Sequence, residues 1–355
     1  MKQINIMTSS DNCLARCIFP QVASIGAHLN SYNVSFYLVH NKISQENVDA
    51  LREYAESFEN ISFADIIVKD TALYETMAKH GGSNRFPPEA YFYFGAHEYL
   101  PGDIDRVMYI DAGDVIINGD ISDYYFDDFE NKSIIATPET FALCTSGAPR
   151  PFELSDLDDP RHLNRIRMNC INSGCIVINL NSFREKNDRL INGYLHHIEK
   201  MCNMPPLNYT GAAYLCDQGL LAVSFFGDIK LFGLAEGLKT VETTAYSGDS
   251  YPATFNLYRP FNFAQWMHNA ATPIRYAPII IHYIGSPKPW HFKYSYDDIL
   301  NPESVAINEK QIQLHQFWWD YCSMTPVYDE LCKSAASADA VGSEAVNHDT
   351  NLAGA

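Results

Sequence analysis

Short apolar runs alternate with stretches of helical periodicity along this sequence, and this alternation restricts the fold more than any other feature. The runs Ile4–Thr8, Val34–Val39 and Ile61–Val68 predict strands, and Phe19–Asn30 and Gln45–Phe58 between them predict helices. Strands that alternate with helices predict an α/β fold with a mostly parallel central sheet covered by helices on both faces. Ligands of such sheets bind beyond the carboxyl ends of the strands.

The same reading continues towards the C-terminus. It predicts an aromatic-rich helix at Pro88–Tyr99 and strands at Arg106–Asp111, Ile171–Leu180 and Tyr276–Ile281. We therefore expect the chemistry of the protein to lie directly after Ile6, Ile110 and Ile281.

The length of 355 residues allows one large α/β domain or two small ones, and no internal repeat or linker divides the chain. We expect a single domain over residues 1–330, with polar, aromatic insertions at about 138–169 and 236–272. From residue 335 to 355 the composition changes to small and polar residues, which predicts a disordered tail.

The formal net charge of −18 excludes nucleic acid and anionic lipid as expected partners. It would also repel a diphosphate, so a phosphate site in this chain needs local cations or a metal.

The nine cysteines are irregularly spaced, and no CxxC pair occurs among them. No apolar run approaches the roughly 20 residues that span a bilayer. The aromatic run Trp318–Tyr321 is not followed by basic residues. These features predict a soluble, cytoplasmic protein without disulfides or membrane attachment.

Two carboxylates, Asp111 and Asp114, follow the predicted strand that begins at Arg106, in the order Asp-Ala-Gly-Asp. Oxygen ligands in this position suit a hard divalent cation such as manganese or magnesium, which would neutralise a leaving diphosphate. The alternative is a solvated turn with an Asp N-cap. Gly113 permits a bulged turn in which both carboxylates face the metal, or a turn in which only one binds directly and the other acts through water.

A second candidate segment, Ile281–His291, begins at the end of a predicted buried strand. A neutral imidazole at His282 can complete a metal site, Gly285 permits close approach of the backbone to phosphate, and Lys288 supplies a cation. The alternative from spacing alone is a structural histidine with a surface lysine.

These segments resemble glycosyltransferase family 8, the retaining GT-A group that contains glycogenin and lipooligosaccharide galactosyltransferases. The family pattern His-x-x-Gly-x-x-Lys-Pro-Trp is similar to His282–Trp290, and its strand–Asp-x-Asp–strand segment is similar to Arg106–Ile121, with one extra residue here. The resemblance implies that Asp111, Asp114 and His282 bind manganese or magnesium. It also implies that Asp111, Ala112, Gly285 and Lys288 contact the donor.

The resemblance extends to the donor sugar and the nucleotide. Asn169–Leu180 is similar to a family strand whose Asn and small residues meet the donor sugar, which implies that Asn172, Ser173 and Gly174 do so here. Asp217 and Gln218 correspond to residues near the sugar hydroxyls and the anomeric carbon. From the residues alone, a core strand with a glycine bulge and a helix N-cap are the alternatives. The nucleotide side corresponds to Thr8, Ser10, Asp11, Asn12 and Tyr93, with Ser10 where the family has Asp and Tyr93 where it has Arg.

The prediction that follows is a metal-dependent, retaining hexosyltransferase that moves glucose or galactose from a UDP-sugar to a glycan or other hydroxyl acceptor. Asp217 and Gln218 are its candidate catalytic residues. The alternative from another class is a nucleotide-sugar or glycan-binding protein that has lost transfer, and a third reading is a nucleotide-sugar hydrolase.

Overall fold

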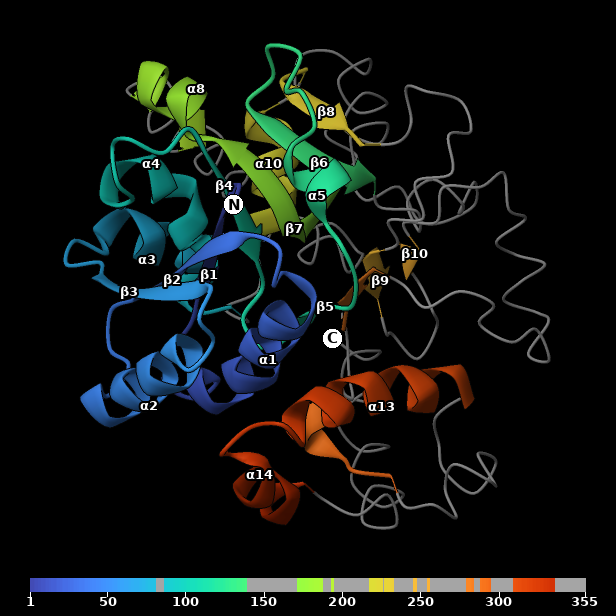
Figure 1. Cartoon of the computed structure of the whole chain (residues 1–355). Helices are drawn as coiled ribbons and strands as arrows, with labels where there is room; N and C mark the ends of the chain where they lie inside the picture. Colours follow the sequence, from blue (N-terminus) through green and yellow to red (C-terminus); the bar gives the residue numbers. More distant parts are fainter. Residues whose placement is uncertain are drawn as a thin grey trace, which may run out of the picture.

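A mostly parallel sheet of seven strands organises the part of the chain that the computed structural model describes (Figure 1). The described residues are 1–80, 86–138, 171–187, 193–194, 217–225, 227–232, 245–247, 254–255, 279–283, 288–294 and 309–335. The predicted insertions at about 138–169 and 236–272, the tail beyond residue 335 and Gly285 lie wholly or mostly outside these ranges.

The strand order of this sheet is β3-β2-β1-β4-β7-β6-β8. β1 pairs in parallel with β2 and β4, β2 with β3, and β6 with β8. Only β7 runs against its neighbours β4 and β6 among these strands. The predicted mostly parallel α/β fold is therefore confirmed. The strands span Gln3–Ser9 (β1), Asn33–His40 (β2), Ile61–Ile67 (β3), Arg106–Ile110 (β4), Ile134–Pro138 (β6), Ile171–Asn179 (β7) and Ile229–Leu231 (β8).

The reversed direction of β7 decides what meets the end of β4. Because the two strands are antiparallel, the beginning of β7 lies at the edge where β4 ends, with Cys175 opposite Ile110. The amide of Asp111 continues this pairing by donating to the carbonyl of Gly174 at 2.9 Å. Residues at the start of β7 therefore lie at the same edge of the sheet as residues that directly follow β4.

A second sheet, in the order β10-β9-β11-β5, begins directly after the Asp111–Asp114 turn. Its strands are Val115–Ile117 (β5), Ala245–Ser247 (β9), Thr254–Phe255 (β10) and Ile280–His282 (β11). We predicted a buried strand over Tyr276–Ile281 that ends at His282. Within the described residues, β11 does end at His282, which is paired in the strand opposite Val115 of β5.

Helices cover both faces of the central sheet (Figure 1). On one face, α1 and α2 pack on the strands, and α13 packs on the outer side of α1. On the other face lie α3, a 3-10 helix η2, α4, α8 and α10. These helices span Ile18–His28 (α1), Gln45–Glu56 (α2), Ala72–His80 (α3), Pro88–Gly95 (η2), Ala96–Tyr99 (α4), Leu180–Glu185 (α8), Asp217–Ser224 (α10) and Glu309–Cys322 (α13); the shorter helices η1, α5, η4 and α14 span Ala15–Cys17, Ser122–Tyr125, Pro289–His291 and Tyr328–Ser334.

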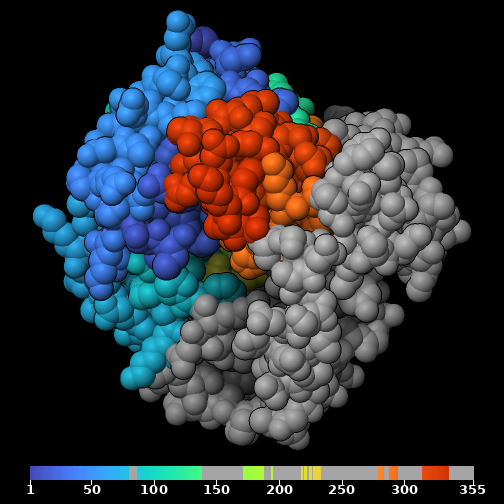
Figure 2. Space-filling model, turned by 90° about the horizontal axis from the view of Figure 1, so that it is seen from below, coloured from blue at the N-terminus to red at the C-terminus, as the bar shows by residue number. Residues whose placement is uncertain are grey.

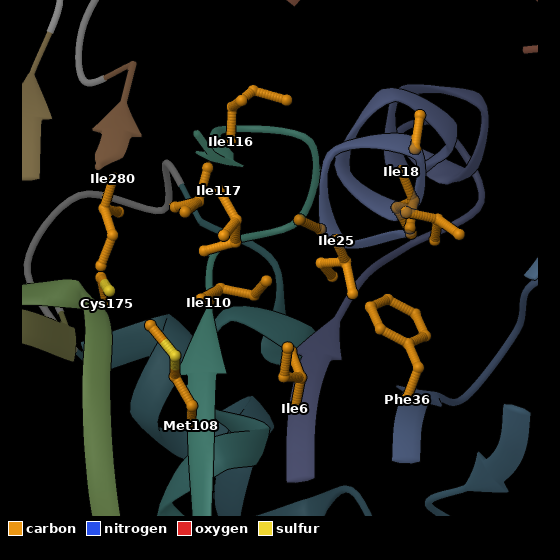
Figure 3. Close-up of a cluster of buried hydrophobic side chains, with 14 of the residues drawn as sticks. Ile6, Ile18, Ile25, Phe36, Met108, Ile110, Ile116, Ile117, Cys175 and Ile280 are labelled. Carbon is orange, nitrogen blue, oxygen red and sulfur yellow. The ribbon is translucent and has the colours of Figure 1, made fainter. Parts of the chain in front are cut away.

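Alternate residues of each strand enter opposite hydrophobic cores, as the period of two of a β-strand requires. In β4, Met108 and Ile110 face the core with α1, and Val107 and Tyr109 face the core with η2. Figure 3 shows the first core continuing beneath the second sheet, where side chains of β4, β5, β7 and β11 meet. The two sheets thus share one core just behind the Asp111–Asp114 turn.

One predicted helix changes type along its length, and one predicted strand ends a residue early. The helix predicted at Pro88–Tyr99 has these bounds, but it is a 3-10 helix up to Gly95 and an α-helix only afterwards. At the junction a Cβ on Gly95 would lie 1.9 Å from the hydroxyl of Tyr74, so the chain is pressed closely against α3 there. The predicted strand Ile171–Leu180 ends at Asn179, because the Asn179 side chain accepts from the Ser182 amide at 3.0 Å and caps α8.

Candidate functional site

The turn between β4 and β5 carries both predicted metal-binding carboxylates. Gly113 has φ +73°, the left-handed conformation that glycine adopts without strain. The buried Gln21 of α1 donates from Nε2 to the Asp111 carbonyl at 2.9 Å, and the Tyr283 amide donates to the Asp114 carbonyl at 2.8 Å. The extra residue of Asp-Ala-Gly-Asp is therefore accommodated in a bulged turn held on two sides.

His282 reaches this turn from the second sheet. Its Nε2 lies 3.2 Å from Asp111 Oδ2, and one ligand atom from each of Asp111, Asp114 and His282 lies within 4.8 Å of the others. On the other side of the ring, Nδ1 lies 2.9 Å from Asn172 Oδ1, which also accepts from the Gly174 amide. An oxygen that acts as acceptor assigns a proton to Nδ1, so Nε2 is the ring nitrogen that faces the carboxylates.

The chemistry of this cluster fits a divalent cation. Asp114 Oδ1 is buried and has no hydrogen-bond partner among the described residues. A Cβ on Gly174 would lie 2.1 Å from His282 Cε1 and 2.3 Å from Asp111 Oδ2, so only glycine leaves this space open. Two carboxylates and one imidazole are a donor set that manganese and magnesium accept.

The two carboxylates have different electrostatic surroundings. Burial opposes ionisation of Asp111, but the hydrogen bond and charge of His282 outweigh it and hold the pKa of Asp111 below its usual range. Burial raises the pKa of Asp114, although the neighbouring ammonium of Lys288 partly offsets it. The Asp111 side chain is still 31% exposed, so this carboxylate is both charged and open to a ligand.

Lys288 binds the turn directly. Its Nζ lies 2.6 Å from Asp114 Oδ2 and 2.6 Å from the Tyr283 carbonyl. The ammonium therefore lies at the edge of the cluster. Gly285, predicted to contact the donor as well, lies outside the described residues.

A second group of polar side chains surrounds Asp217 at the start of α10. Asp217 Oδ2 accepts from the Ser173 hydroxyl at 3.0 Å and from the Tyr93 hydroxyl at 3.1 Å, and Gln218 Oε1 accepts from the Ser173 amide at 3.2 Å. Burial, reinforced by the charge of Asp111, raises the pKa of Asp217 to about 6. The structure thus brings together Ser173, Asp217 and Gln218, three residues that the resemblance assigns to the donor sugar and its reaction.

A stacked pair of tyrosines joins the two groups. The rings of Tyr93 and Tyr109 lie 4.4 Å apart, and while Tyr93 binds Asp217, the Tyr109 hydroxyl donates to Asp111 Oδ1 at 2.9 Å. Burial raises the pKa of both phenols well above the usual value, so both hydroxyls act as neutral donors. Tyr93 is fully buried, and it contacts this group of polar side chains by donating to Asp217.

The loop after β1, predicted to hold the nucleotide, lies at the same edge of the sheet and is internally hydrogen-bonded. Thr8 is buried and donates to the last carbonyl of β4, and Ser10 donates to the carbonyl of the next residue. Asp11 Oδ1 accepts from two backbone amides that follow it, and Asn12 Oδ1 accepts from two groups at the start of α2. Ala112, in the adjacent turn, is also buried.

Sequence reasoning missed three residues that hold the site, namely Gln21, Tyr109 and Trp318. Tyr109 carries a usable signal, because it lies two residues before Asp111 in a strand and so points to the same face. Gln21 lies inside an apolar helix, where a buried amide needs a polar partner. Trp318 donates to the Gly113 carbonyl from a helix about 200 residues away in the chain, which no local pattern predicts.

Comparison with known proteins identifies the family to which this geometry belongs. The family model described as Glycosyl transferase family 8 matches residues 5–293. This chain belongs to glycosyl transferase family 8. The match includes every predicted site residue, from Thr8 to Lys288, and ends before α13. No curated protein sequence matches the chain.

Solved structures of glycosyltransferases resemble the fold. The apo structure of the bifunctional glycosyltransferase WbbM superposes with a TM-score of 0.63 at 16% identity, over 94% of this chain and 52% of WbbM. The galactosyltransferase LgtC, in complex with donor and acceptor sugar analogues, gives 0.54 at 18% identity, over 88% and 95%. GlyE of Streptococcus pneumoniae TIGR4 gives 0.54 at 17%, over 98% and 64%. The GT-A fold is confirmed, and the chain spans about half the length of WbbM.

The family to which the chain belongs is one of glycosyl transferases. Among the described residues, no helix combines the length and the apolar character that crossing a membrane requires.

Proposed function

We propose that this glycosyltransferase is a retaining, metal-dependent hexosyltransferase that moves glucose or galactose from a UDP-sugar to a glycan or other hydroxyl acceptor. The observation that carries the proposal is the cluster of Asp111, Asp114 and His282, whose ligand atoms lie within 4.8 Å of one another. Asp217, which the resemblance assigns to the donor sugar, is joined to this cluster through Tyr93 and Tyr109. A diphosphate site beside a sugar site is the arrangement that a nucleotide-sugar donor needs.

Asp111, Asp114 and His282 would hold manganese or magnesium. The bound cation supplies positive charge to the leaving diphosphate. Asp111 is ionised and open, Asn172 holds the His282 ring with Nε2 facing the carboxylates, and Asp114 Oδ1 has no competing partner among the described residues.

Lys288 would stabilise the negative charge that develops on the departing diphosphate. Its Nζ is already held 2.6 Å from Asp114, so the ammonium needs little reorganisation when the donor binds. In a chain of net charge −18, this fixed cation also offsets the general repulsion of an anionic donor.

Asn172, Ser173, Gly174 and Asp217 would bind the donor sugar. An ionised Asp217 accepts hydrogen bonds from sugar hydroxyls, while Ser173 and Tyr93 fix its other contacts. Gln218 is oriented by its bond to the Ser173 amide and would line the face of the anomeric carbon. Retention would then follow from attack by the acceptor on the same face as the leaving phosphate, whose oxygen takes the proton of the acceptor hydroxyl.

The nucleotide would lie along the loop Thr8–Asn12, and the acceptor would lie against the insertions at about 138–169 and 236–272, within one domain over residues 1–330. The hydrogen bonds that Asp11 accepts within the loop, and those that Asn12 accepts from the start of α2, support a preformed loop, since they fix the backbone that a base and ribose would contact. Tyr93 would act on the donor through Asp217.

A screen of nucleotide sugars for thermal stabilisation, with and without manganese, tests the donor class, and turnover of the best donor tests the chemistry. We expect UDP-glucose or UDP-galactose to stabilise the protein only with the cation. We also expect Asp111→Ala to lose turnover. Full UDP-sugar turnover by Asp111→Ala would contradict the proposal.

The second candidate is a nucleotide-sugar-binding protein that has lost transfer. The ion pair between Lys288 and Asp114 favours it, because one oxygen of a predicted metal ligand is already engaged. Calorimetric titration with UDP and manganese beside a product assay separates the two. Tight binding without transfer or hydrolysis would establish the binding protein.

A further inference from the structure

The helix α13 (Glu309–Cys322) lies beyond the part of the chain that the family model matches, yet it packs beside the donor site. Figure 2 shows the C-terminal helices, in red, against the N-terminal helices and next to the segment around residues 279–294, in orange. Its sequence contains Trp318-Trp319, an aromatic pair that no motif of the donor site explains.

Trp318 binds the turn that carries the metal ligands. Its side chain is fully buried, and Nε1 donates to the Gly113 carbonyl at 3.0 Å. Gly113 belongs to the Asp-Ala-Gly-Asp turn, which is one residue longer than the family pattern Asp-x-Asp. The indole therefore satisfies a backbone carbonyl of the lengthened turn, directly before Asp114.

Trp319 binds the segment that carries Lys288. Its Nε1 donates to the Pro289 carbonyl at 3.0 Å and to the Phe292 carbonyl at 2.8 Å, and the side chain is buried. One turn earlier in the helix, the Leu314 carbonyl accepts from the hydroxyl of Tyr283, the residue after His282. Adjacent residues of one helix thus hold the two chain segments whose ion pair is Lys288–Asp114.

We propose that α13 is a positioning element of the donor site, in which Trp318 fixes the lengthened metal-binding turn and Trp319 fixes the diphosphate-binding segment. The proposal rests on the proposed function for the ligands that the two segments bind. Neither tryptophan touches the donor; each acts through a backbone carbonyl of the segment it holds.

The physical reason is that a buried carbonyl without a donor is costly, so each segment prefers the conformation that meets its indole. Gln21 holds the first residue of the turn from α1, and Trp318 holds its third residue from α13. Without Trp318 the glycine is free to adopt other conformations, and Asp114 moves with it.

The test compares Trp318→Phe with Trp319→Phe, which both keep an aromatic ring and remove the indole N–H. Manganese affinity is measured from the electron paramagnetic resonance signal of the free ion in the presence of UDP, and UDP affinity by calorimetry at saturating manganese. We expect Trp318→Phe to weaken manganese binding roughly tenfold, and Trp319→Phe to weaken UDP binding by a similar factor with a smaller effect on manganese.

The control is Phe36→Leu, a change in the same core but on β2, away from the site. Phe36→Leu should lower the melting temperature as the tryptophan variants do. Its affinities for manganese and for UDP should stay within twofold of those of wild type. Wild-type affinity for both ligands in the two tryptophan variants, or an equal loss in Phe36→Leu, would overturn the inference. If wild type itself binds no manganese with UDP, the proposed function fails and this inference with it.

A measurement on the wild-type protein covers the case in which Trp318→Phe does not fold. The ¹⁵N–¹H indole signals of the tryptophans are followed while magnesium and UDP are added, and Trp319→Phe and Trp290→Phe assist their assignment. We expect the Trp318 indole signal to shift at saturation. If none of the indole signals moves although UDP binds, the positioning role is contradicted.

Discussion

Asp217 is the residue whose surroundings differ most from those of a solvated carboxylate. Its Oδ2 accepts from two hydroxyls, but no Lys or Arg among the described residues forms an ion pair that would balance its charge. Burial first, and then the charge of Asp111, raises its pKa from 3.8 to about 6. Tyr93, a neutral donor where the family has Arg, explains why the charge is not compensated.

This shift predicts a pH dependence of stability in the metal-free protein. The folded state binds the Asp217 proton more tightly than the unfolded chain, so the stabilisation is present below about pH 4 and lost as the pH rises through 6. Asp217→Asn keeps an acceptor for Ser173 and Tyr93 and removes the titration. Urea unfolding in EDTA should show the variant gaining about 2–3 kcal/mol relative to wild type between pH 4 and pH 7.

The exposed Asp123→Asn is the control for a general effect of removing one negative charge. The unfolding free energy of Asp123→Asn should change with pH as that of wild type does between pH 4 and pH 7. If Asp217→Asn also runs parallel to wild type, the assignment of an uncompensated charge to Asp217 is wrong.

Gly174 makes a separate prediction at the same scale. Gly174→Ala places a methyl group 2.1 Å from His282 Cε1 and 2.3 Å from Asp111 Oδ2, so these ligands must move apart. We expect a stability loss of about 1–3 kcal/mol and a large loss of manganese binding, measured by denaturation and by titration. In the control Gly102→Ala, the added methyl group meets no atom within 4 Å, so stability and manganese binding should both stay unchanged. If Gly174→Ala bound manganese as tightly as wild type, the geometry of the cluster would be refuted.

At the scale of elements, the loop after β1 is tied to the start of α2. Asn12 Oδ1 accepts from the Ser44 amide at 2.9 Å and from Asn47 Nδ2 at 3.0 Å, and the Ser44 hydroxyl accepts from the Asn47 amide as the N-cap of α2. Asn12, which the resemblance assigns to the nucleotide, therefore forms one hydrogen-bonded unit with the N-cap Ser44 of α2.

This connection separates a structural role of Asn12 from a role in nucleotide binding. Asn12→Ala and Ser44→Ala should each cost about 1 kcal/mol of stability in denaturation experiments. If Asn12 also contacts the nucleotide, UDP affinity measured by calorimetry falls in Asn12→Ala and is retained in Ser44→Ala. An equal UDP affinity in both variants would limit Asn12 to holding α2.

Element-scale features also show how far the sequence predicts this protein. Apolar runs and their polar ends located β1, β2, β3 and β4 to within one or two residues, because burial and turn chemistry are local properties. The direction of β7 was not predictable, since a run buried on both faces reads the same in either orientation. That direction is what brings Asn172 to the end of β4.

The candidate site was predictable where a motif carries the chemistry, as in Asp111, His282 and Lys288. It was not predictable where distant segments hold the motif in place. Tyr93, expected on the nucleotide side, also donates to Asp217, and Trp318 donates to a backbone carbonyl from outside the matched family region. Such contacts depend on packing between elements, which local sequence patterns do not encode.

At the scale of the whole molecule, the cluster of Asp111, Asp114 and His282 lies where the two sheets meet. The turn Asp111–Asp114 connects β4 of the first sheet to β5 of the second, and pairing of β11 with β5 returns His282 to the same place. The shared core behind this junction (Figure 3) makes both sheets part of one support for the site. Metal binding should therefore stabilise the fold as well as the active site.

The most direct test of this account is the rate of UDP release from UDP-glucose and UDP-galactose, with manganese and with EDTA, for wild type and Asp111→Asn. We expect release by wild type only with the cation, and a decrease of at least about 100-fold in Asp111→Asn. Equal rates with manganese and with EDTA, or an Asp111→Asn variant as fast as wild type, would contradict a metal-dependent transferase centred on Asp111, Asp114 and His282.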